Sequence, residues 1–425
     1  MYRSLTCTFL LLVITVCLPA RVADNQFIRG SFIQPHLVEH WDDERWQEEF
    51  KNLGDAGMDF LIFMHTVHTS GEGKTRAVYP SKLFGIESGE TDLLEGCLRN
   101  AKKAGFKIFV GLNFNESWWN VASFTSDWIL GQMRQGNQIA KELIQHYKKR
   151  YPDTMYGWYW VWEVDNSYCK TQAHMDCLVD ALNMNLDFLH QETEDMPFLL
   201  SPFMNSNAST SKECAYMWRY ILSKAHFKDG DIFAPQDCIG AGWLTIDVVG
   251  EWFKELSEAI PAFPRIEFWA NVEMFDQRFW TVSTLGRLKL QMDLLRPYVS
   301  GFISFAYSHY YSPDLKNPLI HNAYVEYIKN GCMPICAAPL PVIALRLDIR
   351  DESETYLEWI PAKEEKEVMG YHIYRNGVLV GNIQYDHNNK CEWRWNAQGK
   401  PGIYTVASYN VCGDESEKRI SFLIE

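Results

Sequence analysis

Short apolar runs alternate with amphipathic stretches between residues 27 and 330. The runs have the length and composition of β-strands, and eight of them are expected, at 27–34, 58–65, 106–113, 155–163, 197–203, 231–237, 265–273 and 301–307. The amphipathic stretches that follow them have the period of helices, and eight are expected, at 43–56, 91–104, 123–150, 171–192, 211–225, 245–260, 283–295 and 318–329. Eight strand–helix units in a row predict an α/β fold of the (β/α)8, or TIM barrel, type.

Helix start and stop signals support this division. Acidic residues open the segment that begins at Asp43, where the positive end of the helix dipole favours them, and Gly57 and Gly105 follow two of the segments. A doubly wound open sheet is the alternative. It would require a glycine-rich phosphate-binding turn after the first strand, and Gly30-Ser31-Phe32 is not such a turn.

The pattern changes after the barrel. We expect the barrel domain to span 24–332 and a proline-rich linker to span 333–341. Residues 342–425 then show alternating runs with turn signals, among them Asn376-Gly377, a dipeptide suited to a two-residue hairpin. A small all-β sandwich is predicted for this tail.

The chain begins with the pattern of an export signal. A positively charged start precedes an apolar stretch at 5–18, which is short for a membrane span, and cleavage after Ala20 or Ala23 fits the pattern. We therefore expect residues 1–23 to be a signal peptide and the mature protein to be secreted or at the cell surface, with a periplasmic location also open. Lipidation at Cys17 and an uncleaved anchor are the alternatives. No later segment is expected to span a membrane.

Composition narrows the class of partner. The net charge of −14 argues against nucleic acid, which requires clustered Lys and Arg. The 11 cysteines, in an exported protein, predict one to three disulfides. The local candidates are Cys391 with Cys412, Cys332 with Cys336, and Cys169 with Cys177. His65 and His68 have no evident third ligand, so neither a metal nor another cofactor is expected.

Two of the predicted strands end on a glutamate among aromatic residues, Glu163 and Glu273. A buried charge is costly unless it is paired or used, and barrel active sites lie at the carboxyl ends of the strands. In the seventh strand Trp269, Asn271 and Glu273 share one face, which must point into the barrel because the other face is apolar. Two carboxyl groups that flank a glycosidic bond can hydrolyse it, at a separation of about 5–5.5 Å in retaining enzymes and about 6.5–9.5 Å in inverting ones.

Other roles for these acids stay open at this point. Glu273 could cap the next helix or pair with Arg278, and Glu163 with Asp165 could be a pair of rim carboxylates that bind solvent or an arginine. Asp165 shares the inward parity of Glu163 and could be the working acid instead. An inverting mechanism would follow if Asp165 or Asp237 replaced one glutamate.

Three motifs lie at or near the predicted strand tips: Gly30-Ser31-Phe32-Ile33-Gln34, Pro235-Gln236-Asp237-Cys238-Ile239-Gly240 and Trp269-Ala270-Asn271-Val272-Glu273. With glutamates after strands four and seven, residues 27–330 resemble the clan of (β/α)8 glycoside hydrolases that place the acid/base after strand four and the nucleophile after strand seven. Through the three motifs they resemble, more closely, a poorly characterised branch of barrel glycosidases of secreted bacterial proteins.

This resemblance implies that Glu163 is the acid/base and Glu273 the nucleophile. Many members of the clan carry Asn before the acid/base, to bind the sugar 2-hydroxyl, whereas this chain has Trp162 there. The substrate therefore does not follow from the resemblance. Asn271, on the face of Glu273, is a candidate for the missing amide.

Four features of the tail occur in an order known from another family: Trp359, Gly370-Tyr371-His372-Ile373-Tyr374-Arg375-Asn376-Gly377, Tyr404-Thr405-Val406-Ala407 and Gly413-Asp414-Glu415-Ser416. With them, the tail resembles a fibronectin type III domain. We expect the tail to be a spacer or a support packed against the barrel.

Further residues at the predicted strand tips could bind sugar hydroxyls, and loop anchoring is the alternative for each. These are Gln34, His65, Asn113, Asp165, Gln236, Asp237, Trp269 and Asn271. Tyr307 or Asn113 could donate to Glu273 and keep it ionised. Trp118 and Trp119 are candidates for stacking on a sugar ring, because adjacent indoles on a loop are costly to expose.

The sequence thus predicts a glycoside hydrolase, with a retaining mechanism, that acts on an oligo- or polysaccharide. Two other functions remain open, because fold alone does not decide function. One is a carbohydrate-binding barrel without catalysis. The other is a surface adhesion protein that binds through its tail.

Overall fold

A computed structural model of the chain describes residues 27–120, 126–350, 354–362, 367–418 and 420–425. The expected signal peptide lies outside these residues and stays a prediction. In the described part, no helix is both long and apolar enough to cross a membrane.

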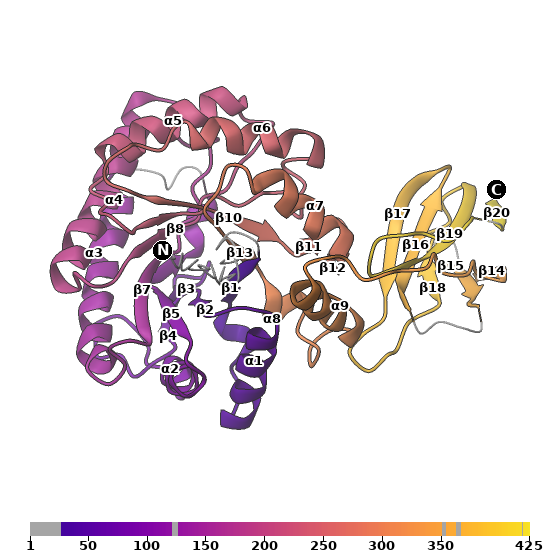
Figure 1. Ribbon diagram of the computed structural model, residues 1–425, viewed down its shortest axis with the longest axis horizontal. Helices are drawn as coiled ribbons and strands as arrows, with labels where there is room; N and C mark the ends of the chain where they lie inside the picture. Colours follow the sequence, from indigo (N-terminus) through magenta and orange to yellow (C-terminus); the bar gives the residue numbers. More distant parts are fainter. Residues whose placement is uncertain (1–26, 121–125, 351–353, 363–366, 419) are drawn as a thin grey trace, which may run out of the picture.

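Eight parallel strands close into a barrel (Figure 1). In chain order, which is also their order around the barrel, they are β1 (Ile28–Ile33), β2 (Phe60–Phe63), β5 (Lys107–Gly111), β7 (Met155–Trp160), β8 (Phe198–Leu200), β9 (Ile232–Phe233), β10 (Glu267–Glu273) and β13 (Gly301–Phe305). Each strand lies inside one of the eight predicted runs. The predicted TIM barrel is therefore confirmed.

Helices surround the barrel in the predicted places. They are α1 (Asp43–Asp55), α2 (Leu93–Ala104), α3 (Ser126–Leu143), α4 (Gln172–Glu192), α5 (Ser211–Lys224), α6 (Ile246–Ser257), α7 (Leu285–Leu295) and α9 (Pro318–Asn330), with a short α8 (Tyr307–Tyr310) after β13. Their ends follow the expected chemistry. The side chain of Asp42 accepts from the backbone N–H of Arg45, and Gly105 ends α2 with φ of 76°, a conformation that glycine adopts without strain.

Side chains alternate on β7 as the sequence predicts. The Tyr159 ring packs inside the barrel against Phe32, with centroids 5.1 Å apart, while Trp160 points outward and donates from Nε1 to Oδ1 of Asn185 on α4 (3.0 Å). The hydrogen-bonded strand ends at Trp160, three residues before Glu163. Glu163 therefore lies beyond the sheet, at its carboxyl end.

A small extra sheet stands above the barrel beside β2 and β5. It consists of β3 (Val67–Thr69), β4 (Thr75–Ala77) and β6 (Asn113–Asn115). The charged insertion at 69–88, which contains β4, places Arg76 and Val78 in the wall of a cleft. The insertion therefore forms part of the cleft wall.

The tail forms two antiparallel sheets. One contains β14 (Ala344–Ile349), β15 (Thr355–Ile360) and β18 (Arg394–Asn396), and the other β17 (Val378–Gln384), β16 (Val368–Arg375), β19 (Gly402–Asn410) and β20 (Ser421–Ile424). Their shared core includes the buried residues Leu357, Trp359 and Tyr371. Asn376 and Gly377 have φ of 50° and 79°, as the predicted hairpin turn requires. The likeness to a fibronectin type III domain stays a prediction.

In the part of the chain that the structure describes, a disulfide joins two cysteines that are distant in sequence. Cys336 of the linker pairs with Cys412, 76 residues later, next to the end of β19. The three local pairings expected from the sequence do not form, so those expectations are wrong: Cys391 with Cys412, Cys332 with Cys336, and Cys169 with Cys177. Cysteines that are near in sequence are not near in space here, because the linker runs beside the end of β19. Asn410 Nδ2 donates to the Ala337 carbonyl there (2.9 Å), next to the disulfide.

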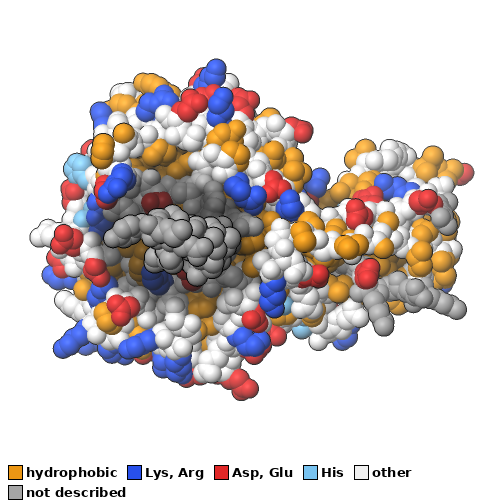
Figure 2. Space-filling model, viewed as in Figure 1, with side chains coloured by type: hydrophobic (Ala, Val, Ile, Leu, Met, Phe, Trp, Pro, Cys, Tyr) orange, Lys and Arg blue, Asp and Glu red, His pale blue; other side chains and the backbone are white. Residues whose placement is uncertain are grey.

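Charged side chains of both signs are interspersed over the barrel face in Figure 2. On that face the excess of acidic residues in the chain is spread out and does not gather into one patch.

Candidate active site

A cleft of about 1070 Å³ opens at the carboxyl ends of the barrel strands. Its acidic residues are Glu39, Glu116, Glu163, Asp165 and Glu273. Its aromatic residues are Phe114, Trp119, Tyr168, Phe203, Trp243, Phe275, Trp280, Phe305 and Tyr310. Apolar walls with a few convergent polar groups are typical of sites for small molecules and sugars.

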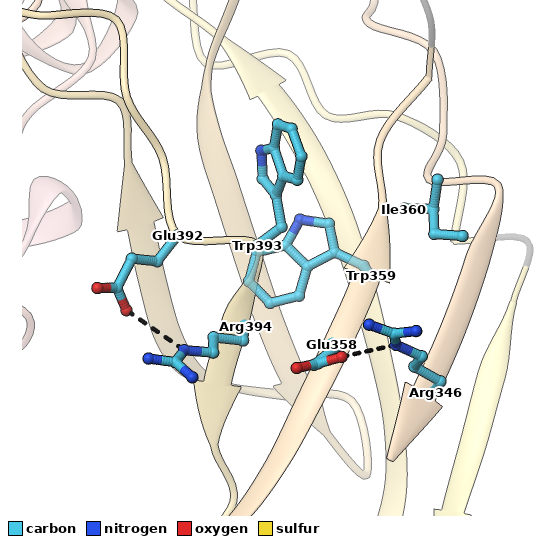
Figure 3. Close-up of a pocket in the computed structure, with 7 residues that line it drawn as sticks. All are labelled: Arg346, Glu358, Trp359, Ile360, Glu392, Trp393 and Arg394. Atoms are coloured by element: carbon cyan, nitrogen blue, oxygen red, sulfur yellow. Dashed lines mark hydrogen bonds and ion pairs between the residues drawn. The ribbon is translucent and has the colours of Figure 1, made fainter. Parts of the chain in front are cut away.

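A second, shallower groove of about 290 Å³ lies on the tail (Figure 3). Its charged residues pair with one another, Arg346 with Glu358 (2.6 Å) and Arg394 with Glu392 (3.8 Å). Because their charges are already matched, the barrel cleft is the stronger candidate for chemistry.

Glu163 is partly exposed to the cleft, just beyond β7. Its Oε1 accepts a hydrogen bond from Nε2 of Gln236 (3.2 Å), and its backbone carbonyl accepts one from Nε1 of Trp118 (3.2 Å). Burial raises the pKa of Glu163, and the single amide donor offsets this only in part. Val161 lines the cleft beside Glu163, and Tyr159 lies near enough below it that burial together with the charge of Glu163 raises the tyrosine pKa, whereas Trp160 points toward the helices.

Glu273 is the last residue of β10, and only 1% of its surface is exposed. Its Oε2 accepts from the backbone N–H of Ala241 (2.7 Å). A Cβ at Gly240 would lie 3.0 Å from that oxygen and 2.4 Å from the carbonyl oxygen of Phe275. Gly240 therefore allows the backbone to approach the carboxyl group closely.

One segment, residues 235–241 after β9, contacts both glutamates. Gln236 donates to Glu163, and Ala241 donates to Glu273. The parallel bridge between Gln236 and Asn271 and the bond from the Asp237 N–H to the Asn271 carbonyl (2.9 Å) fix this segment on β10. We call residues 235–241 the bridging segment, because it sets the two carboxyl groups in one cleft wall.

Asp237 forms a like-charge pair with Glu273 underneath the cleft. Asp237 is fully buried and accepts from Nε2 of Gln291 (2.5 Å) and from the backbone N–H groups of Ile239 (3.2 Å) and Glu273 (3.3 Å). Burial and the charge of Asp237 raise the pKa of Glu273 well above its usual range, and the nearby Arg287 guanidinium offsets part of this effect. The pair therefore holds a proton more tightly than an isolated carboxyl group would.

The role of Glu273 can be tested through this neighbour. Asp237→Asn removes the like charge, so the pKa of Glu273 should fall. If Glu273 acts as the ionised nucleophile, activity is lost as pH falls through its pKa, and the variant should move the acidic limb of the kcat/KM profile to lower pH.

The alternative outcome is equally specific. A shift of the alkaline limb to lower pH would mean that Glu273 acts as the proton donor. Glu39→Gln, which changes an exposed carboxyl at the cleft rim, is the control and should move neither limb. Thermal unfolding of both variants checks that the fold is intact.

The structure places seven of the predicted residues in the cleft wall: Gln34, His65, Trp119, Glu163, Asp165, Gln236 and Glu273. Both carboxyl oxygens of Asp165 accept hydrogen bonds from Ser167, Oδ1 from its backbone N–H and Oδ2 from its hydroxyl. His65 stacks on His68, with ring centroids 5.2 Å apart, and burial together with the neighbouring imidazoles lowers its pKa to about 3. His65 is therefore a neutral hydrogen-bonding group at neutral pH.

Six other predicted residues do not line the cleft: Asn113, Trp118, Asp237, Trp269, Asn271 and Tyr307. Asn113 was expected to face the site, but its Nδ2 turns to α3, toward the Gln132 carbonyl (3.3 Å). Trp118 was expected to stack on sugar, but it is only 2% exposed and supports the Glu163 carbonyl. Asp237 lies beneath Glu273, and its oxygens are engaged there.

Three corrections concern β10 and the end of β13. Trp269 fills the lower barrel, where its ring packs on Phe60 (6.0 Å). Asn271, the candidate for the missing amide, donates instead to Oγ of Ser201 (3.1 Å) below the cleft. Tyr307 points away from Glu273 and pairs through its hydroxyl with Nδ1 of His321 (2.6 Å) on α9.

The sequence interpretation also missed residues. Tyr310, one turn of α8 after Tyr307, reaches the cleft, and burial together with the charge of Glu273 raises its pKa to about 12. Trp243 and Trp280 are 39% and 67% exposed and stand in the cleft wall. Both indoles lie on loops that show no periodic pattern, so the sequence carries no signal that singles them out, and only their exposure in the structure does.

Residues 28–317 match the family model described as Domain of unknown function (DUF4434). The chain belongs to the DUF4434 family. The matched residues contain all eight barrel strands and both glutamates. No curated protein sequence matches the chain significantly.

Solved structures similar to this DUF4434 protein include a Bacteroides thetaiotaomicron protein named as a candidate alpha-L-fucosidase. It has a TM-score of 0.60 and 18% identity, over 77% of this chain and 99% of that chain. An intracellular xylanase of Thermoanaerobacterium saccharolyticum is more distant, with a TM-score of 0.42 and 12% identity over 67% of this chain and 89% of that chain. At this identity, the first likeness shows a shared fold.

Proposed function

We propose that this DUF4434 protein is a glycoside hydrolase that acts on an oligo- or polysaccharide with retention of configuration. The observation that carries the proposal is the bridging segment, which binds Glu163 and Glu273 in the wall of one aromatic cleft. A two-carboxylate mechanism requires two carboxyl groups that flank the same glycosidic bond, and here one loop holds two carboxyl groups, from the ends of separate strands, in one cleft wall.

In the first step Glu163 donates its proton to the glycosidic oxygen while the Glu273 carboxylate attacks the anomeric carbon. The bond from that carbon to the glycosidic oxygen breaks, and a glycosyl ester forms on Glu273. In the second step the Glu163 carboxylate takes a proton from water, whose oxygen attacks the anomeric carbon and releases Glu273.

The surroundings of Glu163 fit its role, and those of Glu273 act in both directions. Burial keeps Glu163 protonated to a higher pH than a free carboxyl group, as a proton donor requires. The Ala241 N–H and the positive charge of Arg287 favour the ionised form of Glu273. They act against burial and against Asp237, so we expect activity to require a pH above the usual range of carboxyl groups.

The aromatic wall supports a sugar substrate. Trp119, Trp243 and Trp280 expose indole faces to the cleft, and such faces are costly to leave in water without a ligand. The structural neighbour named as a candidate fucosidase agrees with this substrate class, although its name does not identify the sugar for this chain.

The anomer of the first product tests the mechanism. Proton NMR recorded in the first minutes of hydrolysis should show a sugar with the configuration of the substrate bond. A product of inverted configuration would contradict the covalent step on Glu273. It would mean that water attacks the anomeric carbon directly, with a carboxylate as the general base.

A further inference from the structure

A hairpin at the mouth of the cleft presents Trp280. The hairpin consists of β11 (Phe275–Asp276) and β12 (Thr281–Val282) and follows directly after Glu273. The Trp280 ring lies parallel to the ring of Phe275 (6.3 Å, 10°), and Phe275 lies nearly parallel to Tyr310 (5.3 Å, 23°). All three rings line the cleft, so together they form one aromatic wall.

The C-terminal sandwich holds this hairpin through side-chain amides. Oε1 of Gln384 accepts from the Val282 N–H (2.8 Å), and its Nε2 donates to the Val282 carbonyl (2.8 Å). One side chain thus makes the pair of bonds that a neighbouring strand would make. Nδ2 of Asn382 adds a bond to Oγ1 of Thr281 (3.1 Å).

A tyrosine orients the two amides. The Tyr409 hydroxyl donates to Oδ1 of Asn382 (2.8 Å) and accepts from Nε2 of Gln384 (2.7 Å). Tyr409 thus fixes which end of each amide carries the oxygen. Asn382 therefore presents its Nδ2 to the hairpin, and Gln384 presents both its Oε1 and its Nε2.

The hairpin needs external support. Each of its strands has only two residues, and an isolated two-stranded hairpin is marginally stable. Trp280 also has φ of 53°, which is uncommon outside glycine and persists where the surroundings enforce it. On the barrel side the Gln277 N–H donates to the Gly240 carbonyl (2.9 Å). The sandwich supplies the support on the other side, next to α7 and β12 in Figure 1.

We propose that the C-terminal sandwich positions Trp280 as a platform for the apolar face of a sugar ring, with Asn382, Gln384 and Tyr409 as the positioning residues. The class of ligand rests on the proposed function, whereas the positioning rests on the contacts alone. The tail is then a structural part of the substrate site.

A second anchor makes the proposal testable. The Leu285 N–H donates to the Val411 carbonyl (2.8 Å), and a Cβ at Gly286 would lie 1.9 Å from the carbonyl oxygen of Cys412, so the start of α7 packs tightly on the sandwich. Gln384→Ala should therefore release the hairpin while the sandwich stays docked.

The experiment compares Gln384→Ala, Trp280→Ala and the double variant in the full mature chain. Val378→Ala is the control, because Val378 lies on the same strand and is 65% exposed. Retardation in native gels that contain xylan, laminarin or glucomannan reports binding, and amide hydrogen exchange of residues 275–283 reports the order of the hairpin.

We expect both single variants to weaken binding about fivefold to tenfold, the size expected for the loss of one stacked ring. The double variant should bind as weakly as Trp280→Ala, because both changes act on one contact. The amides of the hairpin should exchange faster only in the two variants that carry Gln384→Ala. The Val378→Ala control should match wild type in gel retardation and in hydrogen exchange. In hydrolysis assays, KM of the variants should rise, while their kcat should stay within about twofold of the wild-type value.

Additive losses, or faster exchange in Gln384→Ala without weaker binding, would overturn the positioning role. If none of the polysaccharide gels retards the wild-type protein, Trp280 is not a platform for a sugar ring. Retardation that depends on Trp280 and Gln384 in a protein without hydrolytic activity would contradict the proposed function and would leave this inference standing.

Discussion

Glu273→Gln should lower kcat by on the order of 10⁴-fold or more, with little change in stability. Glutamine has nearly the same shape, and its Oε1 can still accept from the Ala241 N–H that now bonds Glu273. It cannot form the glycosyl ester, so the loss falls on the chemical step. The measurement is kcat on an aryl glycoside that wild type hydrolyses, together with thermal unfolding.

Two comparisons sharpen this result. Glu48→Gln makes the same chemical change at an exposed site on α1 and should leave kcat within about twofold, as expected for a surface substitution. Glu273→Ala with added azide should form a glycosyl azide of inverted configuration, because the anion replaces the missing nucleophile. Residual activity of Glu273→Gln within tenfold of wild type would remove Glu273 from the mechanism.

Glu163→Gln should slow hydrolysis in a way that depends on the leaving group. For a sugar leaving group, which needs the proton, kcat/KM should fall by about 10²–10⁴-fold. For an aryl leaving group that departs without a proton, kcat/KM should stay close to wild type, and the second step should become limiting.

The pH profile of Glu163→Gln gives an independent check. Burial raises the pKa of Glu163, and a proton donor loses activity as pH rises through its pKa. The alkaline limb should therefore disappear in the variant. Equal losses on both leaving groups, with the limb retained, would assign the proton donation to another residue.

The barrel could be predicted because its signals are local. Apolar runs and helix ends depend on neighbours in sequence, and the inward parity of Tyr159 on β7 follows from the period of a strand. The parity rule stops where the strand stops. Tyr307 lies in α8, directly after β13, and turns to His321, while Tyr310 reaches the cleft.

The same limit explains the tryptophan pair. Trp118 and Trp119 lie in a 3₁₀ turn, where adjacent side chains point in different directions, so one supports the Glu163 carbonyl and the other faces the cleft. The sequence shows two adjacent indoles, but it does not show which of them the neighbouring elements cover.

The rest of the site could not be predicted, because it depends on contacts between segments that are far apart in sequence. The bridging segment contains one of the motifs behind the family resemblance, and Gln236 and Asp237 were expected to bind sugar. In the structure they hold the two glutamates, since β9 lies next to β10 and near β7. Arg287 and Gln291 reach Glu273 from α7, one element further along the chain.

The most direct test of the central claim is a hydrolysis screen. The mature wild-type protein and the Glu163→Gln/Glu273→Gln double variant are each incubated with a panel of polysaccharides and aryl glycosides, and released reducing ends and aryl groups are measured. The account predicts release from at least one substrate by wild type and none above background by the double variant. Equal release by both proteins, or no release by wild type from any substrate while it still binds a glycan, would contradict it.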